Sequence, residues 1–169
     1  SMKKILFIFL PLFLIYTQTT NAQMDKELAL LKAQKAIGLI TEQQFDEGIS
    51  LLKESVNLDP ENYFIAYELG YAYFLKEDYK NVIITLEKIK YHKDVTIELF
   101  EILGNSYEIS MQRDEALATY YEGISKFPQS GKLYFEKGNL YWSNKNIGEA
   151  LRSYEKGIEV EPDFASNYY

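Results

Sequence analysis

The fold is decided by residues 97–130, IELFEILGNSYEISMQRDEALATYYEGISKFPQS, whose pattern returns in the adjoining stretch of equal length, residues 131–164. Gly104 and Gly138 hold the same place in the two stretches, each three residues before a tyrosine, and Gly70 holds it one stretch earlier. A fixed period of about 20–50 residues is typical of repeat proteins, in which neighbouring units stack on one another. The chain is therefore predicted to be a stacked array of units.

The spacing inside the quoted stretch predicts a pair of closely packed helices. Phe100, Leu103, Gly104 and Tyr107 recur at i, i+3, i+4 and i+7, which places them on one helix face. Glycine in the middle of a helix costs roughly 1 kcal/mol relative to alanine. Its recurrence at one phase indicates that a second helix approaches closely, and Tyr120 is predicted to fill the space above Gly104.

Prolines at positions 60, 128 and 162 mark helix ends, because the residue before a proline is disfavoured in the α region. The second unit lacks this proline, so the connection across residues 90–96 is the least constrained. No strand-like alternation occurs, and the predicted fold class is all-α, an α-solenoid of antiparallel helix hairpins with 34-residue repeats. First helices are predicted near residues 29–41, 63–75, 97–109 and 131–143, and second helices near residues 44–57, 78–91, 112–126 and 146–159.

The full set of offsets resembles the tetratricopeptide repeat, whose pattern is an aromatic residue, Leu-Gly, Tyr, Ala, a second aromatic residue and Pro. The resemblance covers roughly residues 29–164 and implies four units, of which the first is degenerate. Residues 165–169 then begin a further repeat, either as a short stub or as the start of a truncated unit. The predicted units are residues 29–62, 63–96, 97–130 and 131–164, after a lead-in at residues 23–28, and the matching positions of the third unit are Phe100, Leu103, Gly104, Tyr107, Ala116, Tyr120 and Pro128.

Residues 1–22 have the features of a secretory signal peptide, with Ser1 as a cloning remnant. Lys3 and Lys4 precede an apolar stretch at residues 5–16, and small residues at positions 20 and 22 would allow cleavage before Gln23. A membrane anchor is the alternative, but a span needs about 20 apolar residues. The expected localisation is the bacterial envelope, periplasmic or extracellular, and the chain contains no cysteine for disulfides.

The composition argues against several classes of function. The net charge of −7 disfavours a nucleic-acid partner, which needs a basic face. The chain has one histidine, His92, and no cysteine, so the common zinc sets are not available. Neither a G-x-S-x-G elbow nor a glycine-rich phosphate loop occurs. The sequence therefore predicts a protein that is not an enzyme, with no catalytic residues, metal or cofactor.

The family resemblance implies that partners bind in a groove formed by the first helix of each unit. Aromatic residues give a large contact area at low entropy cost, and asparagine can bond a peptide backbone. The rings could instead pack between hairpins, and this alternative stays open. The predicted groove residues are Tyr67, Tyr71 and Phe74 in the second unit, Glu101, Asn105 and Glu108 in the third, and Phe135, Asn139 and Trp142 in the fourth.

Together these features predict an exported scaffold that holds a protein or peptide in its groove. Two other hypotheses are an interaction arm of a larger exported enzyme or receptor, and a binder of glycans or small ligands. No nucleic-acid partner and no stable membrane span after cleavage are expected. Self-association is a further hypothesis, either through open repeat ends or through the retained apolar segment at residues 5–16 lying in an aromatic groove.

Overall fold

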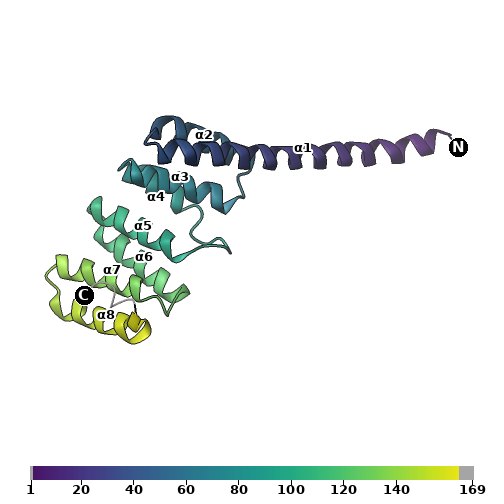
Figure 1. The fold of residues 1–169 in the computed structure, drawn as a ribbon. Helices are drawn as coiled ribbons and strands as arrows, with labels where there is room; N and C mark the ends of the chain where they lie inside the picture. The colour runs from purple at the N-terminus through teal and green to yellow at the C-terminus, as the bar shows by residue number, and fades with distance from the viewer. Residues whose placement is uncertain (1, 164–169) are drawn as a thin grey trace. The chain divides into compact units, whose positions relative to one another are not determined.

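The computed structural model describes residues 2–163, and the side chains of residues 20–163. Every regular element in this part of the chain is an α-helix, and the helices follow one another as hairpins (Figure 1). The predicted all-α class is therefore confirmed. The helices are α1 (Met2–Thr41), α2 (Phe45–Leu58), α3 (Tyr63–Leu75), α4 (Tyr79–Leu86), α5 (Ile97–Ile109), α6 (Arg113–Lys126), α7 (Gly131–Ser143) and α8 (Ile147–Val160).

The chain forms two compact units, each larger than a single repeat. From here on, the first unit is Ser1–Glu68 and the second unit is Leu69–Tyr169. In the first unit, α1 and α2 pack along each other, and Ala29, Ala33 and Ala36 of α1 are buried. Ser55 on α2 is fully buried and donates its hydroxyl hydrogen bond to the carbonyl oxygen of Ala29 at 2.8 Å. Small side chains at this contact let the two helices approach closely, since side-chain size sets the interaxial distance.

The second unit repeats one packing device, a ring or a leucine lying over a glycine. A Cβ atom added to Gly104 would lie 3.0 Å or closer to three ring atoms of Tyr120, and one added to Gly138 would meet three ring atoms of Tyr154 equally closely. Leu86 occupies the same place over Gly70. The prediction that Tyr120 fills the space above Gly104 is thus confirmed, and Tyr120 is fully buried there.

Helix boundaries agree with the sequence expectation except at two places. The starts of α3, α5 and α7 fall on the predicted residues. The starts of α2, α6 and α8 lie one residue later than predicted. The first helix, however, extends back to Met2 instead of starting near residue 29. The fourth helix was predicted to reach residue 91, which is wrong, because α4 ends at Leu86.

Tertiary contacts explain the early end of α4. Residues 87–95 form consecutive turns with bonds from Ile89 N–H to Leu86 O and from His92 N–H to Ile89 O. This tighter path places Lys90 Nζ 3.0 Å from a Glu87 oxygen and 3.1 Å from a Glu122 oxygen. Ion pairs thus fix the connection that lacks a proline.

The apolar stretch at residues 5–16 lies outside the residues whose side chains are described. Its backbone is continuous with α1, so the predicted cleavage point between Ala22 and Gln23 falls inside a helix. Among the described residues, no helix combines the length and the apolar character that crossing a membrane requires.

The turn inside each hairpin contains a residue with a left-handed backbone. Gln43, Glu77, Met111 and Lys145 have φ values of 63°, 62°, 61° and 61° and stand one repeat length apart. The left-handed region is costly for a residue with a Cβ and free of that cost for glycine. The repeat therefore imposes one turn conformation on four different side chains, none of which is glycine.

Replacing Met111 with glycine is expected to raise the free energy of unfolding by about 0.5–1 kcal/mol. The left-handed penalty is removed, and the added flexibility of the unfolded chain offsets only part of that gain. Met111 is 77% exposed, so little packing is lost. Urea unfolding followed by circular dichroism measures the change. Ala118→Gly at an exposed position inside α6 is the control and should cost about 1 kcal/mol; equal losses in the two variants would contradict the explanation.

Candidate functional site

The predicted groove residues lie on three first helices, and the structure distributes them over both units. Tyr67 belongs to the first unit, and the other eight belong to the second. The six that α5 and α7 carry are brought together because these two helices contact each other directly. We call these six the α5–α7 surface: Glu101, Asn105, Glu108, Phe135, Asn139 and Trp142.

Two asparagines of this surface are held by tyrosines of their own hairpins, of which Tyr120 is buried and Tyr154 is half-buried. Tyr120 donates its hydroxyl hydrogen bond to Asn105 Oδ1 at 2.6 Å, and Tyr154 donates to Asn139 Oδ1 at 2.9 Å. Because each amide oxygen is the acceptor, each amide nitrogen is left as the donor. The same ring that fills the space over a glycine therefore sets the orientation of an amide on the surface.

Carboxylates surround these amides. Glu101 pairs with Lys132 at 2.6 Å, and the Ser143 hydroxyl donates to Glu108 at 3.4 Å. Glu136 accepts from the Asn139 amide nitrogen at 3.4 Å. Three carboxylates and one lysine therefore lie on or beside this surface, and the local charge is negative.

Burial and charge act together on the titration of this cluster. Burial is the main cause that raises the pKa of the Glu136 carboxyl, and the neighbouring charges of Glu101 and Glu108 raise it further. The pKa of Tyr120 is also raised, first by burial and then by the same three carboxylates. An approaching cation or hydrogen-bond donor would relieve this repulsion.

The aromatic members differ in how much of the ring is available. Trp142 is 56% exposed and Tyr71 is 38% exposed, so both present their rings to solvent. Phe135 is half-buried with its ring centroid 5.5 Å from that of Tyr154, and Phe74 is half-buried 6.0 Å from Tyr79. Tyr67 is half-buried and stacks on Tyr63 at 6.0 Å. Phe74 and Phe135 thus contact rings of the second helix in their own hairpins, which is the packing role that the sequence left open.

Sequence reasoning missed the residues that support the surface. Lys132 and Glu136 were not predicted as part of it, and the link from Tyr120 and Tyr154 to the amides was not foreseen. A signal was present, since the pairs Asn105–Tyr120 and Asn139–Tyr154 each span 15 residues and recur at the repeat period.

A second polar cluster lies where α4 leads into its turns. Burial alone would lower the pKa of Lys90, but the hydrogen bonds and charges of Glu87 and Glu122 outweigh it and raise the pKa. Tyr107 donates to Glu87 at 2.9 Å, and burial with this bond raises the pKa of Tyr107 to about 12. The cavity here has a volume of about 270 Å³. Because its charged groups already bond one another, we assign the cluster a structural role.

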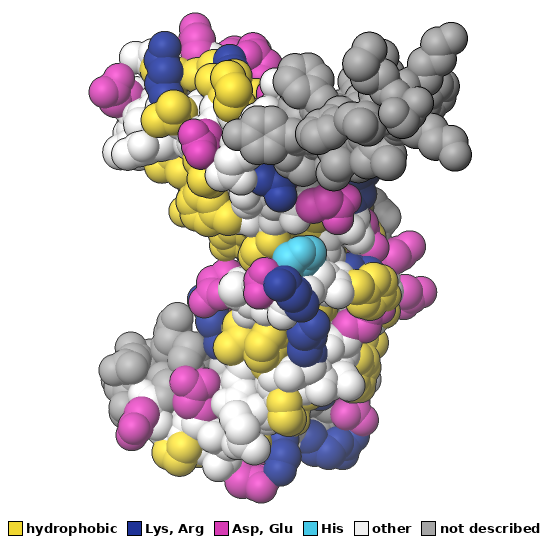
Figure 2. Space-filling model, turned by 90° about the vertical axis from the view of Figure 1, so that its right-hand side faces the viewer, with side chains coloured by type: hydrophobic (Ala, Val, Ile, Leu, Met, Phe, Trp, Pro, Cys, Tyr) yellow, Lys and Arg dark blue, Asp and Glu magenta, His cyan; other side chains and the backbone are white. Residues whose placement is uncertain are grey.

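One face of the described surface mixes charges of both signs. On the face drawn in Figure 2, magenta acidic and dark blue basic side chains are mixed with yellow apolar ones. Among the described side chains, no three carboxylates or imidazoles are placed to hold a metal ion. His92 lies in the turns after α4, where its Nδ1 accepts the backbone N–H of Asp94 at 3.2 Å.

Comparison with known proteins finds solved structures with a similar fold and a family match for one repeat. The chain resembles the "Crystal structure of MamA" with 22% identity and a TM-score of 0.74, over 89% of this chain and 87% of that one. A second structure, "Crystal structure of MamA protein", gives 23% identity and a TM-score of 0.73, over 84% and 78% of the two chains. The "MamA RS-1 ArsTM double mutant" gives 17% identity and 0.71, over 84% and 80%.

A search of curated proteins finds no match to the sequence. Residues 131–164 match the tetratricopeptide repeat family, which corresponds to one whole predicted unit. The solved structures share the helical solenoid fold. One repeat is therefore similar in sequence to the tetratricopeptide repeat, and the helical solenoid fold is similar to that of the solved structures.

Proposed function

We propose that the protein is a scaffold without catalytic activity that binds a peptide or protein segment on the α5–α7 surface. The observation that carries this proposal is the pair of tyrosine–asparagine bonds in two consecutive hairpins. They hold the two amides in a fixed orientation, at a spacing set by the repeat, and each amide nitrogen carries two N–H groups, of which Asn139 uses one for Glu136. Preorganised donors of this kind bind a backbone carbonyl at a lower entropy cost than free side chains.

The surroundings of the amides define the partner further. Trp142 offers an exposed ring as an anchor, and tryptophan is enriched among residues that dominate binding energy. Three carboxylates against one lysine would repel an acidic segment. The segment that fits is therefore extended or helical, neutral or basic, and carries an apolar side chain for Trp142.

Replacing Trp142 with alanine is expected to weaken binding of such a segment by about 10- to 100-fold, as the loss of an exposed aromatic anchor does. Peptides selected on the wild-type chain from a random displayed library serve as the probe, and calorimetry gives the affinities. Asn139→Ala should also weaken binding, through loss of the amide donor. Tyr91→Ala is the matched control, because Tyr91 is 76% exposed and lies outside the surface. Unchanged affinity in both surface variants, with unchanged melting, would contradict the proposal.

We also propose that residues 1–22 direct export to the bacterial envelope and are removed. Support comes from the two lysines before an apolar stretch and from Ala22 before the cleavage point. Expression in a Gram-negative host should give a periplasmic chain that starts at Gln23, as mass spectrometry would show. Ala22→Tyr should block processing, because the site requires a small residue. An intact cytoplasmic chain would refute export.

A further inference from the structure

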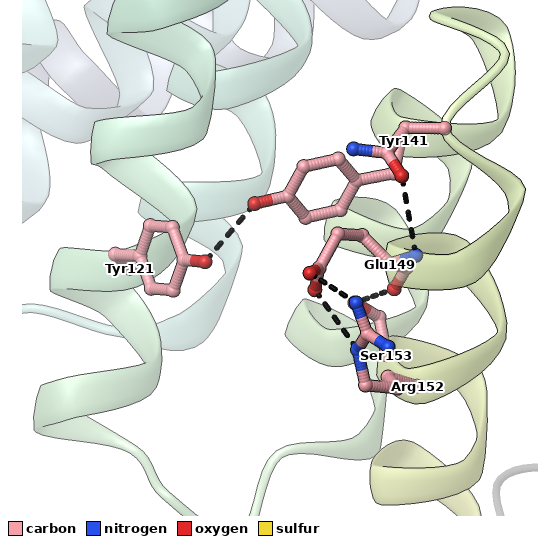
Figure 3. A network of polar contacts seen from close by, with 6 residues as sticks. Tyr121, Tyr141, Glu149, Arg152 and Ser153 are labelled. Atoms are coloured by element: carbon pink, nitrogen blue, oxygen red, sulfur yellow. Dashed lines mark hydrogen bonds and ion pairs between the residues drawn. The ribbon is translucent and has the colours of Figure 1, made fainter.

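The second unit shows how a second helix of one hairpin receives the first helix of the next. Tyr121 on α6 meets α7 twice: its hydroxyl lies 3.0 Å from the Tyr141 hydroxyl, and Lys137 Nζ lies 4.8 Å from its ring centroid (Figure 3 shows the tyrosine pair). Leu117 and Ile124 flank Tyr121 on the same side of α6, and both are half-buried. This side of α6 is therefore the packing surface for the following helix, α7.

The same side of α8 keeps the two flanking aliphatic residues, has a glutamate at the place of Tyr121, and is open. Leu151, Glu155 and Ile158 stand one repeat length after Leu117, Tyr121 and Ile124. Leu151 is 51% exposed and Ile158 is 48% exposed, and Ile147 nearby is 44% exposed. Within residues 2–163, no helix covers this side of α8.

The chain also contains a helix that would fit the open side of α8. On α7, Leu133 and Leu140 are buried, and Leu133 Cδ1 would lie 3.0 Å from a Cβ atom on Gly123 of α6. Three repeat lengths earlier, α1 carries Leu31 where α7 has Leu133, and Gly38 where α7 has Leu140.

This side of α1 is open as well. Leu31 is 64% exposed, and a Cβ atom on Gly38 would meet nothing within 4 Å. Lys35 stands between them, at the place of Lys137 on α7. Each compact unit therefore presents one unfilled half of a contact that α6 and α7 make inside the chain.

We propose that α8 of one copy receives α1 of a second copy, in the register in which α6 receives α7. The apolar contact joins Leu151 and Ile158 to Leu31, with room above Gly38 for a partner side chain. Burial of such exposed apolar side chains drives association.

Charge supports the same register. Inside the chain, Lys137 on α7 faces position 121 of α6; between copies, Lys35 would face Glu155, a residue of opposite charge. The nearby cations already have acidic neighbours, since Lys32 pairs with Glu54 at 2.7 Å and Lys156 with Glu159 at 2.7 Å. Arg152 pairs with Glu149 in the same way (Figure 3). The contact uses two different surfaces, so an assembly keeps one unfilled surface at each end and grows with concentration.

The experiment blocks one surface at a time in the full chain. Leu31→Asp disables the α1 side, and Leu151→Asp disables the α8 side. Sedimentation velocity over a concentration series should show the wild-type mass rising and each variant remaining a monomer. An equimolar mixture of the two variants should form a dimer and nothing larger, because one intact surface remains on each. Both side chains are exposed, so matched circular dichroism and melting establish that the variants fold.

Several results would overturn the proposal. A wild-type chain that stays monomeric at all concentrations would mean that the α8 side has another occupant, such as the chain's own following residues. Association of one variant alone at the wild-type level would indicate a contact between two identical surfaces. Association of both variants at that level would point to residues 5–16.

The register has its own test. Lys35→Glu and Glu155→Lys should each weaken association at least tenfold, and the chain carrying both changes should recover it. Failure of the double variant to recover, with the single variants impaired, would refute the pairing of Lys35 with Glu155.

Discussion

Replacing Tyr120 with alanine is expected to lower the free energy of unfolding by about 4 kcal/mol. Removal of a large buried aromatic side chain costs the lost transfer energy and leaves a cavity, together about 3–5 kcal/mol. Tyr120 is fully buried, and its ring fills the space above Gly104. Because small domains are stable by only about 5–15 kcal/mol, much of the second unit should lose its cooperative structure. Chemical denaturation followed by circular dichroism measures the loss.

Two neighbouring changes separate the causes of that loss. Tyr120→Phe keeps the ring and removes only the bond to Asn105, so a cost of about 1 kcal/mol is expected. Tyr121→Ala removes a ring that is 48% exposed and should cost much less than Tyr120→Ala. If the two alanine variants were equally stable, Tyr120 would not be the core residue that its burial indicates.

Gly104→Ala and Gly38→Ala are expected to change stability in opposite directions. At Gly104 the new Cβ meets ring atoms of Tyr120, which is held on all sides, and overpacking of this kind costs typically about 1–3 kcal/mol. At Gly38 the new Cβ meets nothing within 4 Å, so the higher helix propensity of alanine should stabilise by up to about 1 kcal/mol.

Thermal unfolding at low micromolar concentration measures both effects without interference from self-association. The two changes have the same chemistry, so a difference in sign can come only from the surroundings of the glycine. If Gly104→Ala were neutral or stabilising, the close approach of α5 and α6 would not be what keeps glycine at this position.

Much of the fold could be predicted because its determinants are local and recur. Helix starts at residues 63, 97 and 131 follow from the repeat period, and the contact of Tyr120 with Gly104 follows from helical spacing. The end of α4 could not be predicted in this way. It depends on Lys90 reaching Glu122 in the following hairpin, and local helix preference is weaker than such tertiary contacts.

The left-handed turns could not be predicted for a different reason. Glycine usually marks such a turn, but here the positions hold Gln43, Glu77, Met111 and Lys145, which have no common chemistry. The same two backbone bonds close each turn, for example from Met111 N–H to Glu108 O and from Gln112 N–H to Tyr107 O, and the side chains adapt to this path. Only their common spacing of one repeat length would have indicated that these positions are equivalent.

The role of the candidate site stays a prediction, and the structure shows only where its residues lie. Residues on α5 and α7 were placed by the repeat register, and the structure brings these helices into contact. The acidic neighbour Glu136 and Lys132, which pairs with Glu101, were missed, because Glu136 directly follows the predicted Phe135 and Lys132 lies about one helical turn before it. Polar networks depend on side-chain reach, which helical spacing alone does not give.

The bond between a core tyrosine and a surface asparagine has a consequence for how such a protein could evolve. Under the proposed function, Asn105 and Asn139 would take part in recognition and in hairpin packing through the same amide, so a mutation there would change both binding specificity and folding stability. Glu101, Glu108 and Trp142 are tied to the core less directly and can drift at small cost. New partners would thus be acquired by changing Glu101, Glu108 or Trp142, while the two amides would continue to bind the backbone of each partner.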